Sequence, residues 1–147
     1  MPTAVRETVM LGLLARLAAA NYAGLTVERD RREDVPPEEM PRAILFDETR
    51  QRVIAETTEE KRYELFALVE GHVTGATDAA VASALNALVG AVQAAIEADP
   101  TLGGAALGAF EATSDRIIDE AEGHRPIGVA QMAVSVRFRT SRASPYS

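Results

Sequence analysis

The residues of this sequence that could do chemistry include three carboxylate pairs, two histidines and one glycine-rich stretch. A carboxylate acts as a general acid or base near neutral pH only when burial or a neighbouring charge shifts its pKa. All three pairs fall in predicted turns or loops, where water surrounds carboxylates, so we expect no catalytic acid among them. The pairs are Glu38/Glu39, Glu59/Glu60 and Asp119/Glu120.

The histidines and the glycine-rich stretch also lack the spacing that a site requires. His72 and His124 belong to separate predicted elements and form no HExxH pair, so we interpret both as structural histidines. Residues 101–108, TLGGAALG, lack the lysine and hydroxyl of a phosphate-binding loop, and they follow a predicted helix instead of starting one. We therefore predict no catalytic, cofactor-binding or metal-binding residue, and no enzyme activity.

The composition limits the classes of protein that remain. The 147 residues suffice for one domain with its own core, and the absence of cysteine excludes disulfides and thiolate metal sites. A formal net charge of −7 argues against a general nucleic-acid-binding surface, because binding to phosphates requires a basic face. No apolar run reaches the roughly 18 residues of a membrane span, so we expect no membrane partner.

The most regular pattern in the sequence predicts a helix over residues 77–99. Alanine, which favours helices, fills most positions outside the apolar stripe. Thr77 or Asp78 can cap the start of this helix, and Pro100 ends it. The stripe recurs at steps of three and four residues and comprises Val81, Leu85, Leu88, Val92 and Ile96.

The remaining pattern predicts one further helix and several strands. Residues 129–140 alternate apolar and polar side chains, which is typical of a strand with one buried face. The charged, proline-containing residues 30–41 form a predicted loop, which is either a partner site or a solvated connector. The predicted helix covers residues 3–21, and the other predicted strands cover residues 25–29, 43–47, 51–56, 62–73 and 109–119.

Two strands supply the candidate interface. On one face of the strand at 62–73, Phe66 and Leu68 lie between charged residues, so they pack under a loop, under a second helix or against another subunit. On the last strand, Arg137 and Arg139 point away from the apolar face. We therefore take Phe66, Leu68, Arg137 and Arg139 as the candidate interface residues.

The order of helix, strands, helix and two strands predicts an α+β fold. We expect a single antiparallel or mixed β-sheet, packed against two α-helices on one face. We expect one domain over residues 1–140 and a flexible C-terminal tail over residues 141–147.

Residues 70–104, with their strand, turn, alanine-rich helix and DPTLGG in that order, resemble a segment of a known family. The family is that of the tail terminator, or tail completion, proteins of long-tailed bacteriophages and gene transfer agents. Residues 125–140, RPIGVAQMAVSVRFRT, resemble the block in which these proteins end. The amphipathic first helix and the proline-rich residues 36–46 are similar in type to the corresponding parts of the family. The resemblance spans about residues 5–140.

The resemblance implies a structural virion protein without catalytic residues, in the tail or neck of a particle assembled in the host bacterial cytoplasm. Such subunits form a hexameric ring that caps the tail tube, ends tube polymerisation and joins the tail to the head-completion proteins. The partners implied are further copies of this chain, the tail tube protein and the head-completion (stopper) protein, with DNA passing through the lumen without sequence-specific binding. Two alternatives stay open: a head–tail connector or stopper ring, and a small α+β enzyme with a small-molecule pocket.

Overall fold

The computed structural model describes residues 4–47, 50–120 and 125–146, with the backbone alone for residues 110–120. In these ranges the chain forms two α-helices, a short 3-10 helix and one mixed sheet of six strands. The elements in chain order are α1 (Val5–Ala18), β1 (Thr26–Arg29), η1 (Pro37–Glu39), β2 (Arg42–Phe46), β3 (Gln51–Glu56), β4 (Glu60–Thr74), α2 (Asp78–Ala98), β5 (Gly108–Glu120) and β6 (Pro126–Ser141).

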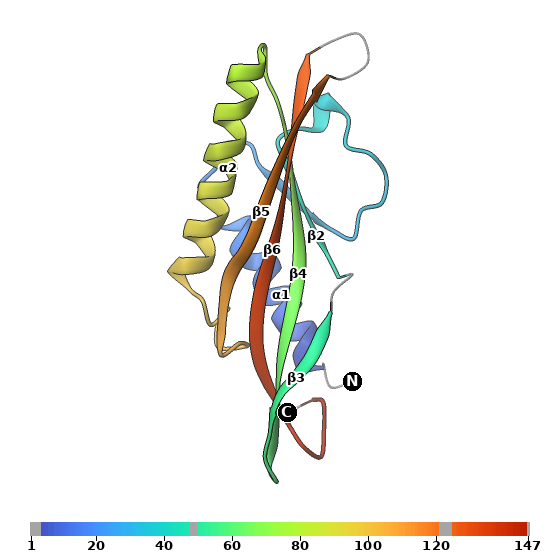
Figure 1. Ribbon diagram of the computed structural model, residues 1–147, viewed down its shortest axis with the longest axis vertical. Helices are drawn as coiled ribbons and strands as arrows, with labels where there is room; N and C mark the ends of the chain where they lie inside the picture. Colours follow the sequence, from blue (N-terminus) through green and yellow to red (C-terminus); the bar gives the residue numbers. More distant parts are fainter. Residues whose placement is uncertain (1–3, 48–49, 121–124, 147) are drawn as a thin grey trace.

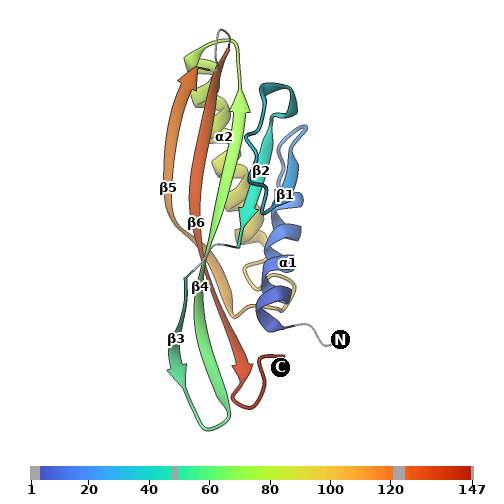
Figure 2. The same cartoon turned by 90° about the vertical axis from the view of Figure 1, so that its right-hand side faces the viewer.

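Both α-helices pack on the same face of the sheet, as Figures 1 and 2 show. Side chains from both helices and from β4 and β6 share one apolar core. The strand order is β1-β2-β4-β6-β5, with β3 also paired to β4, and every pairing is antiparallel except that of β1 with β2. The predicted α+β class, with one sheet and two helices on one face, is confirmed.

Strand β4 is the centre of the sheet. Along one edge its whole length pairs with β6, from Glu60 opposite Ser141 to Thr74 opposite Ile127. Two strands share its other edge, β2 at residues 68–72 and β3 at residues 61–65. The residues of β4 therefore reach from the helix-covered part of the sheet to its far end.

Helix α2 forms where the sequence predicts it. The Thr77 hydroxyl oxygen accepts a hydrogen bond from the Ala80 backbone N–H at 3.1 Å, so Thr77 is the N-cap. By length and composition α2 could span a membrane, but its apolar stripe packs against the sheet as in a core helix. The buried residues of α2 are Val81, Leu85, Leu88, Val89, Val92, Ala95 and Ile96, which include the whole predicted stripe.

Two glycines allow α2 to lie close to the sheet. Gly71 on β4 faces Leu88, and Gly128 on β6 faces Val81 and Leu85. A Cβ at position 128 would stand 2.6 Å from a methyl carbon of each of these two residues, and a Cβ at position 71 would overlap Leu88. Only glycine fits at both positions without a shift of these side chains or of the helix.

Helix α1 is held by its apolar face and by two arginines. Its residues Val9, Met10, Leu13 and Leu17 are buried in the common core. Arg16 donates a hydrogen bond from Nε to the Ala95 carbonyl at 2.9 Å, near the C-terminus of α2, where helix carbonyls lack intrahelical partners. Arg29 of β1 donates to both Glu7 carboxylate oxygens at 2.7 and 2.8 Å, which ties α1 to the sheet.

The lower end of the sheet continues beyond α2 as a three-stranded extension, which we call the arm (residues 50–64 and 137–142; Figure 2). At a rise of ~1.5 Å per helical residue and ~3.3 Å per strand residue, α2 is about 31 Å long and β6 about 53 Å. The helix therefore cannot cover the whole strand. Tyr63 and Phe138 stack with their ring centroids 5.3 Å apart on the helix-side face of the arm.

Several boundaries differ from the sequence prediction. Helix α1 runs over Val5–Ala18 instead of residues 3–21, and β4 begins at Glu60 instead of residue 62. Strand β5 ends at Glu120, so Glu60, Asp119 and Glu120 lie in strands instead of the predicted turns. Strand β6 is longer than predicted and includes Ser141, the first residue of the predicted tail. The Pro145 carbonyl accepts a hydrogen bond from the Val5 N–H at 3.0 Å, and the flexibility of residues 141–147 stays a prediction.

We predict that Leu88→Ala lowers the free energy of unfolding by about 2–5 kcal/mol, because it leaves a cavity between α2 and the sheet. Gly71→Ala should destabilise the wild-type chain through overlap with Leu88 but should destabilise the Leu88→Ala variant less, because space has then been opened. Urea denaturation of the four proteins of this double-mutant cycle measures the coupling.

Gly90→Ala is the matched control, because nothing lies within 4 Å of a Cβ at this exposed position of α2. It should stabilise the protein by about 0.5–1 kcal/mol through helix propensity. Strict additivity of Gly71→Ala and Leu88→Ala would contradict the close contact between α2 and β4.

Candidate functional site

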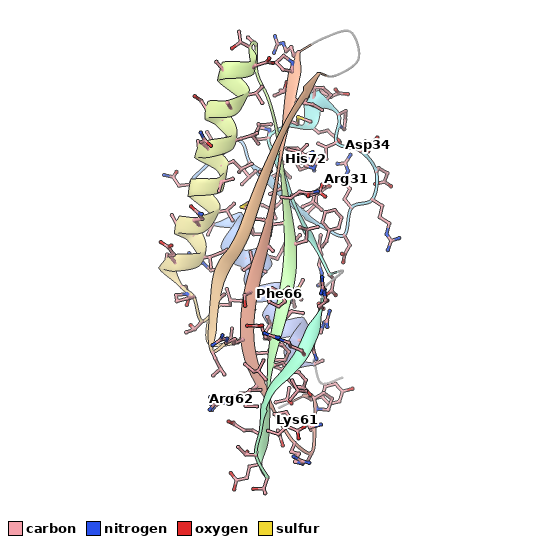
Figure 3. All side chains as sticks on the ribbon, in the orientation of Figure 1. Arg31, Asp34, Lys61, Arg62, Phe66 and His72 are labelled. Atoms are coloured by element: carbon pink, nitrogen blue, oxygen red, sulfur yellow. The ribbon has the colours of Figure 1, made fainter. Side chains whose placement is uncertain are left out.

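The face of the sheet opposite the helices, here called the outer face, carries the candidate interface residues. On β4 it comprises the even-numbered side chains from Arg62 to His72, and on β6 the side chains paired with them, such as Arg137 opposite Glu64. Figure 3 shows the order along β4: His72 beside Arg31 and Asp34 at one end, Phe66 midway, and Lys61 and Arg62 on the arm. The two ends of this face differ in whether a loop covers them and in which charged residues they carry.

The loop between β1 and β2 covers one end of the outer face. Val35 from this loop and Ile44 from β2 are buried, yet neither belongs to the helix-side core. Arg31 fastens the loop through ion pairs with Glu28 at 3.1 Å and Glu39 at 2.7 Å. The predicted loop at residues 30–41 is thus confirmed, with the short 3-10 helix η1 inside it.

His72 lies in this covered end beside Glu70, and its interpretation as a structural histidine stays a prediction. Its Nε2 lies 3.2 Å from a Glu70 carboxylate oxygen, and only 13% of its side chain is exposed. Burial lowers the pKa of His72, and the nearby Arg31 acts in the same direction, whereas Glu70 and Asp34 raise it. The other histidine, His124, lies outside the described residues.

Phe66 and Leu68 occupy the middle of the outer face and are half-buried. Their cross-strand partners on β6 are the small residues Ser135 and Ala133, and Leu68 also lies opposite Phe46 of β2. Among the described residues neither α-helix lies on this face, because both pack into the opposite core. The middle of the outer face is therefore a partly apolar surface within the sheet.

At the arm, the outer face carries a buried carboxylate, Glu64, that the sequence analysis did not single out. Its side chain is only 6% exposed and accepts hydrogen bonds from Arg52 at 2.7 Å and Arg137 at 3.5 Å. The hydrogen bond from Arg52 lowers the pKa of Glu64 most, desolvation opposes this shift, and Arg137 adds to it. The ion pairs of Glu64 with Arg52 and Arg137 thus connect β4 to β3 and β6.

Glu64 was not predicted as a site residue because the side chains that contact it come from different strands. Arg52 and Arg137 stand opposite it only after β3 and β6 have paired with β4. The available signal was its position between Tyr63 and Leu65 in an apolar strand, which by itself does not identify a partner.

The two predicted interface arginines lie on this arm and are exposed. Arg137 is 53% exposed and is bonded to Glu64, whereas Arg139 is 61% exposed and lies 3.7 Å from Glu60. Phe66 stands two residues from Glu64 on β4, so the four predicted interface residues extend from the middle of the outer face to the arm. These positions are those that the strand periodicity predicts; their contact with a partner stays a prediction.

The other chemical candidates from the sequence do not converge on one site. In the glycine-rich residues 101–108, the Asp99 carboxylate accepts hydrogen bonds from the Gly103 N–H and the Thr101 hydroxyl, both at 2.8 Å. These bonds lower the pKa of Asp99 and occupy a loop amide that a phosphate would need. Among the described side chains, residues 4–47, 50–109 and 125–146, no group of three or more Asp, Glu or His residues is placed to hold a metal ion.

Comparison with known proteins identifies no family for this chain. No protein-family model and no curated protein matches the sequence. Among solved structures, a chain of the "Virion of native gene transfer agent (GTA) particle" matches with a TM-score of 0.44 and 12% sequence identity. The match covers 93% of this chain and 92% of that chain, and likeness at this level does not establish a shared family or role.

The lowered pKa of Glu64 predicts that the stability of the arm depends on pH. Folding favours the ionised carboxylate, so its ion pairs stabilise the arm above the ordinary carboxyl pKa of 4.5 and are lost as the pH falls through the lowered value. Glu64→Gln should lower Tm at about pH 7, and its difference from the wild type should be smaller at about pH 3, because the contribution of Glu64 to stability declines as the pH falls below the ordinary carboxyl pKa. Calorimetry at both pH values measures the difference.

Glu59→Gln is the matched control, because Glu59 is an exposed acid on the same hairpin. This change should leave Tm nearly unchanged at both pH values. A Tm difference between wild type and Glu64→Gln that is equal at both pH values would contradict a charge-based role for Glu64.

Proposed function

We propose that this chain is a structural virion protein that acts as the tail terminator of a long-tailed phage or gene transfer agent. Copies of the chain form a ring, which the resemblance implies to be hexameric, at the end of the tail tube. The ring stops addition of tube subunits and presents a surface to the head-completion proteins. The observation that carries this proposal is the resemblance of residues 70–104 and 125–140 to the tail terminator family.

The outer face supports the proposal because it carries apolar and charged residues that could form contacts between copies. A ring uses two different patches on each subunit and closes only at one rotation angle. Phe66 and Leu68 give a partly apolar centre, and the exposed Arg137 and Arg139 give a charged rim. Apolar centres with charged rims are typical of protein interfaces.

The charge of the subunit fits a ring through which DNA passes without being held. Stable DNA binding depends on many Lys and Arg contacts to phosphates, and this chain has 15 basic against 22 acidic residues. The DNA therefore needs no specific site on this protein. We place the protein in the tail or neck of the particle, after assembly in the bacterial cytoplasm.

We predict that Phe66→Glu blocks ring formation, because it would place an unpaired charge in the proposed interface. Arg139→Glu, at an exposed position, should weaken the ring without affecting the fold. Light scattering measures the oligomer mass, and circular dichroism shows whether each subunit stays folded.

Ala87→Glu provides the control for added charge, because Ala87 is exposed on α2, away from the outer face. This variant should assemble like the wild type. Rings of full mass from folded Phe66→Glu and Arg139→Glu subunits would show that the outer face is not the interface.

Removal of the gene during particle production tests the role itself. Without a terminator the tube keeps adding subunits, so electron micrographs should show overlong tails and heads without tails. Expression of the gene from a plasmid should restore normal particles. Tails of normal length, still joined to heads, would refute the terminator role.

A further inference from the structure

Large apolar side chains that are more than one third exposed occur in two places among the described residues. Two of them, Val53 and Ile54, lie on β3 of the arm. The others are Leu107, Tyr146 and Leu11, which lie at or near a hollow beside the start of α1. Apolar side chains grouped in this way on a surface commonly mark a protein contact.

The first group, here called the knob, projects from an edge strand. All six residues of β3 are exposed, and within the part of the chain that the structure describes β3 pairs only with β4. A bulge interrupts its pairing, so Val53 lies opposite Tyr63, Ala55 lies opposite Arg62, and Ile54 has no partner in the ladder. An apolar edge strand left open in this way promotes pairing with another chain unless something covers it.

The second group surrounds a hollow of about 320 Å³. Its walls include the apolar residues Val5, Ala105, Ala106, Leu107 and Tyr146, together with Thr8 and the predicted interface residue Arg139. Hydrogen bonds from the Leu107 N–H to the Arg137 carbonyl at 2.7 Å, and from the Val5 N–H to the Pro145 carbonyl at 3.0 Å, fix its rim. Leu11 extends the apolar surface one helical turn beyond Thr8.

The knob and the hollow occupy different places on one chain. The knob is on β3, and the hollow borders β6, so strand β4 and its pairing with β6 lie between them. Two strand spacings correspond to roughly 10 Å. A contact between knob and hollow would therefore join unlike patches, as the closed ring of a heterologous interface requires.

Charge also favours contact between the arm of one copy and the body of another. The arm, residues 50–64 and 137–142, contains seven Lys or Arg residues and four Glu residues. The rest of the chain contains eight Lys or Arg residues and eighteen Asp or Glu residues. The basic arm of one subunit is therefore attracted to the acidic body of the next, which orients the encounter. Because Arg139 of the arm also lines the hollow, this attraction acts between the arm and the body as wholes and not at the hollow itself.

We infer that the knob of one subunit seats in the hollow of the next copy in the ring, which places Val53 and Ile54 against Leu107 and Tyr146. This inference rests on the proposed ring and adds a second contact between neighbouring copies, beside that of the outer face. The contact covers both exposed apolar groups and the open edge of β3 in one step.

Cysteine cross-linking tests the contact, because the native chain contains no cysteine. Ile54→Cys and Leu107→Cys are made as separate proteins, mixed in equal amounts and treated with a short bismaleimide. A covalent dimer linking positions 54 and 107 should be the main product of the mixture. Because each protein has one cysteine, this product can form only between copies.

Each variant alone should give little dimer, because like positions do not meet in a heterologous contact. Ala87→Cys, exposed on α2, replaces Leu107→Cys in the control mixture and should also give little. A yield for the 54–107 pair that does not exceed this control, or a product dominated by 54–54 dimers, would overturn the inference.

Charged variants test the same contact without a cross-linker. Ile54→Lys and Leu107→Glu should each shift the ring to smaller species, and Tm should stay unchanged because both side chains are exposed. The chain that carries both changes should recover part of the ring mass, because Lys and Glu then meet across the contact. Failure of that recovery, with both single variants still forming rings, would contradict the contact.

The outcomes separate this contact from the proposed function. Rings of normal mass without a 54–107 cross-link would overturn the knob contact and leave the terminator role standing. A 54–107 cross-link together with normal tails after gene removal would refute the role and keep the contact.

Discussion

The close packing of α2 against β4 and β6 is the contact on which the rest of the structure depends. Seven residues of α2 are buried against the sheet, and Gly71 and Gly128 remove the side chains that would hold the helix away. Arg16 then joins α1 to the end of α2 by its bond to the Ala95 carbonyl. Because the core contains few aromatic residues, its stability rests on the shape match of aliphatic side chains.

The same packing explains why the molecule has an arm. A helix residue advances about half as far along its axis as a strand residue, so α2 ends well before β4 and β6 do. The uncovered strands are stabilised by other means: the Tyr63–Phe138 stack on one face and the Glu64 ion pairs on the other. This leaves β3 exposed on an edge, and an exposed apolar edge is a feature that assembly can use.

The two faces of the sheet differ in how well the sequence predicts them. On the helix side, strict alternation along β6 identified Met132, Val134 and Val136 as core residues, and all three are buried. On the outer face, the alternation correctly placed Phe66 and Leu68 but not their surroundings. Glu64 was not predicted as a site residue, yet it is buried by arginines from two other strands, because pairing register brings together residues that are far apart in the chain.

The sequence by itself determined the helices, the strands, the α+β class and the face of each long strand that enters the core, because these depend on local periodicity and on nearby caps such as Thr77. Only the tertiary structure decided which strands are neighbours, that the loop at residues 30–41 covers Ile44 and His72, and that Glu64 is shared by Arg52 and Arg137. It also decided that Leu107 and Tyr146 border one hollow. Such contacts depend on strand order and on the relative lengths of helix and strand, which no local pattern encodes.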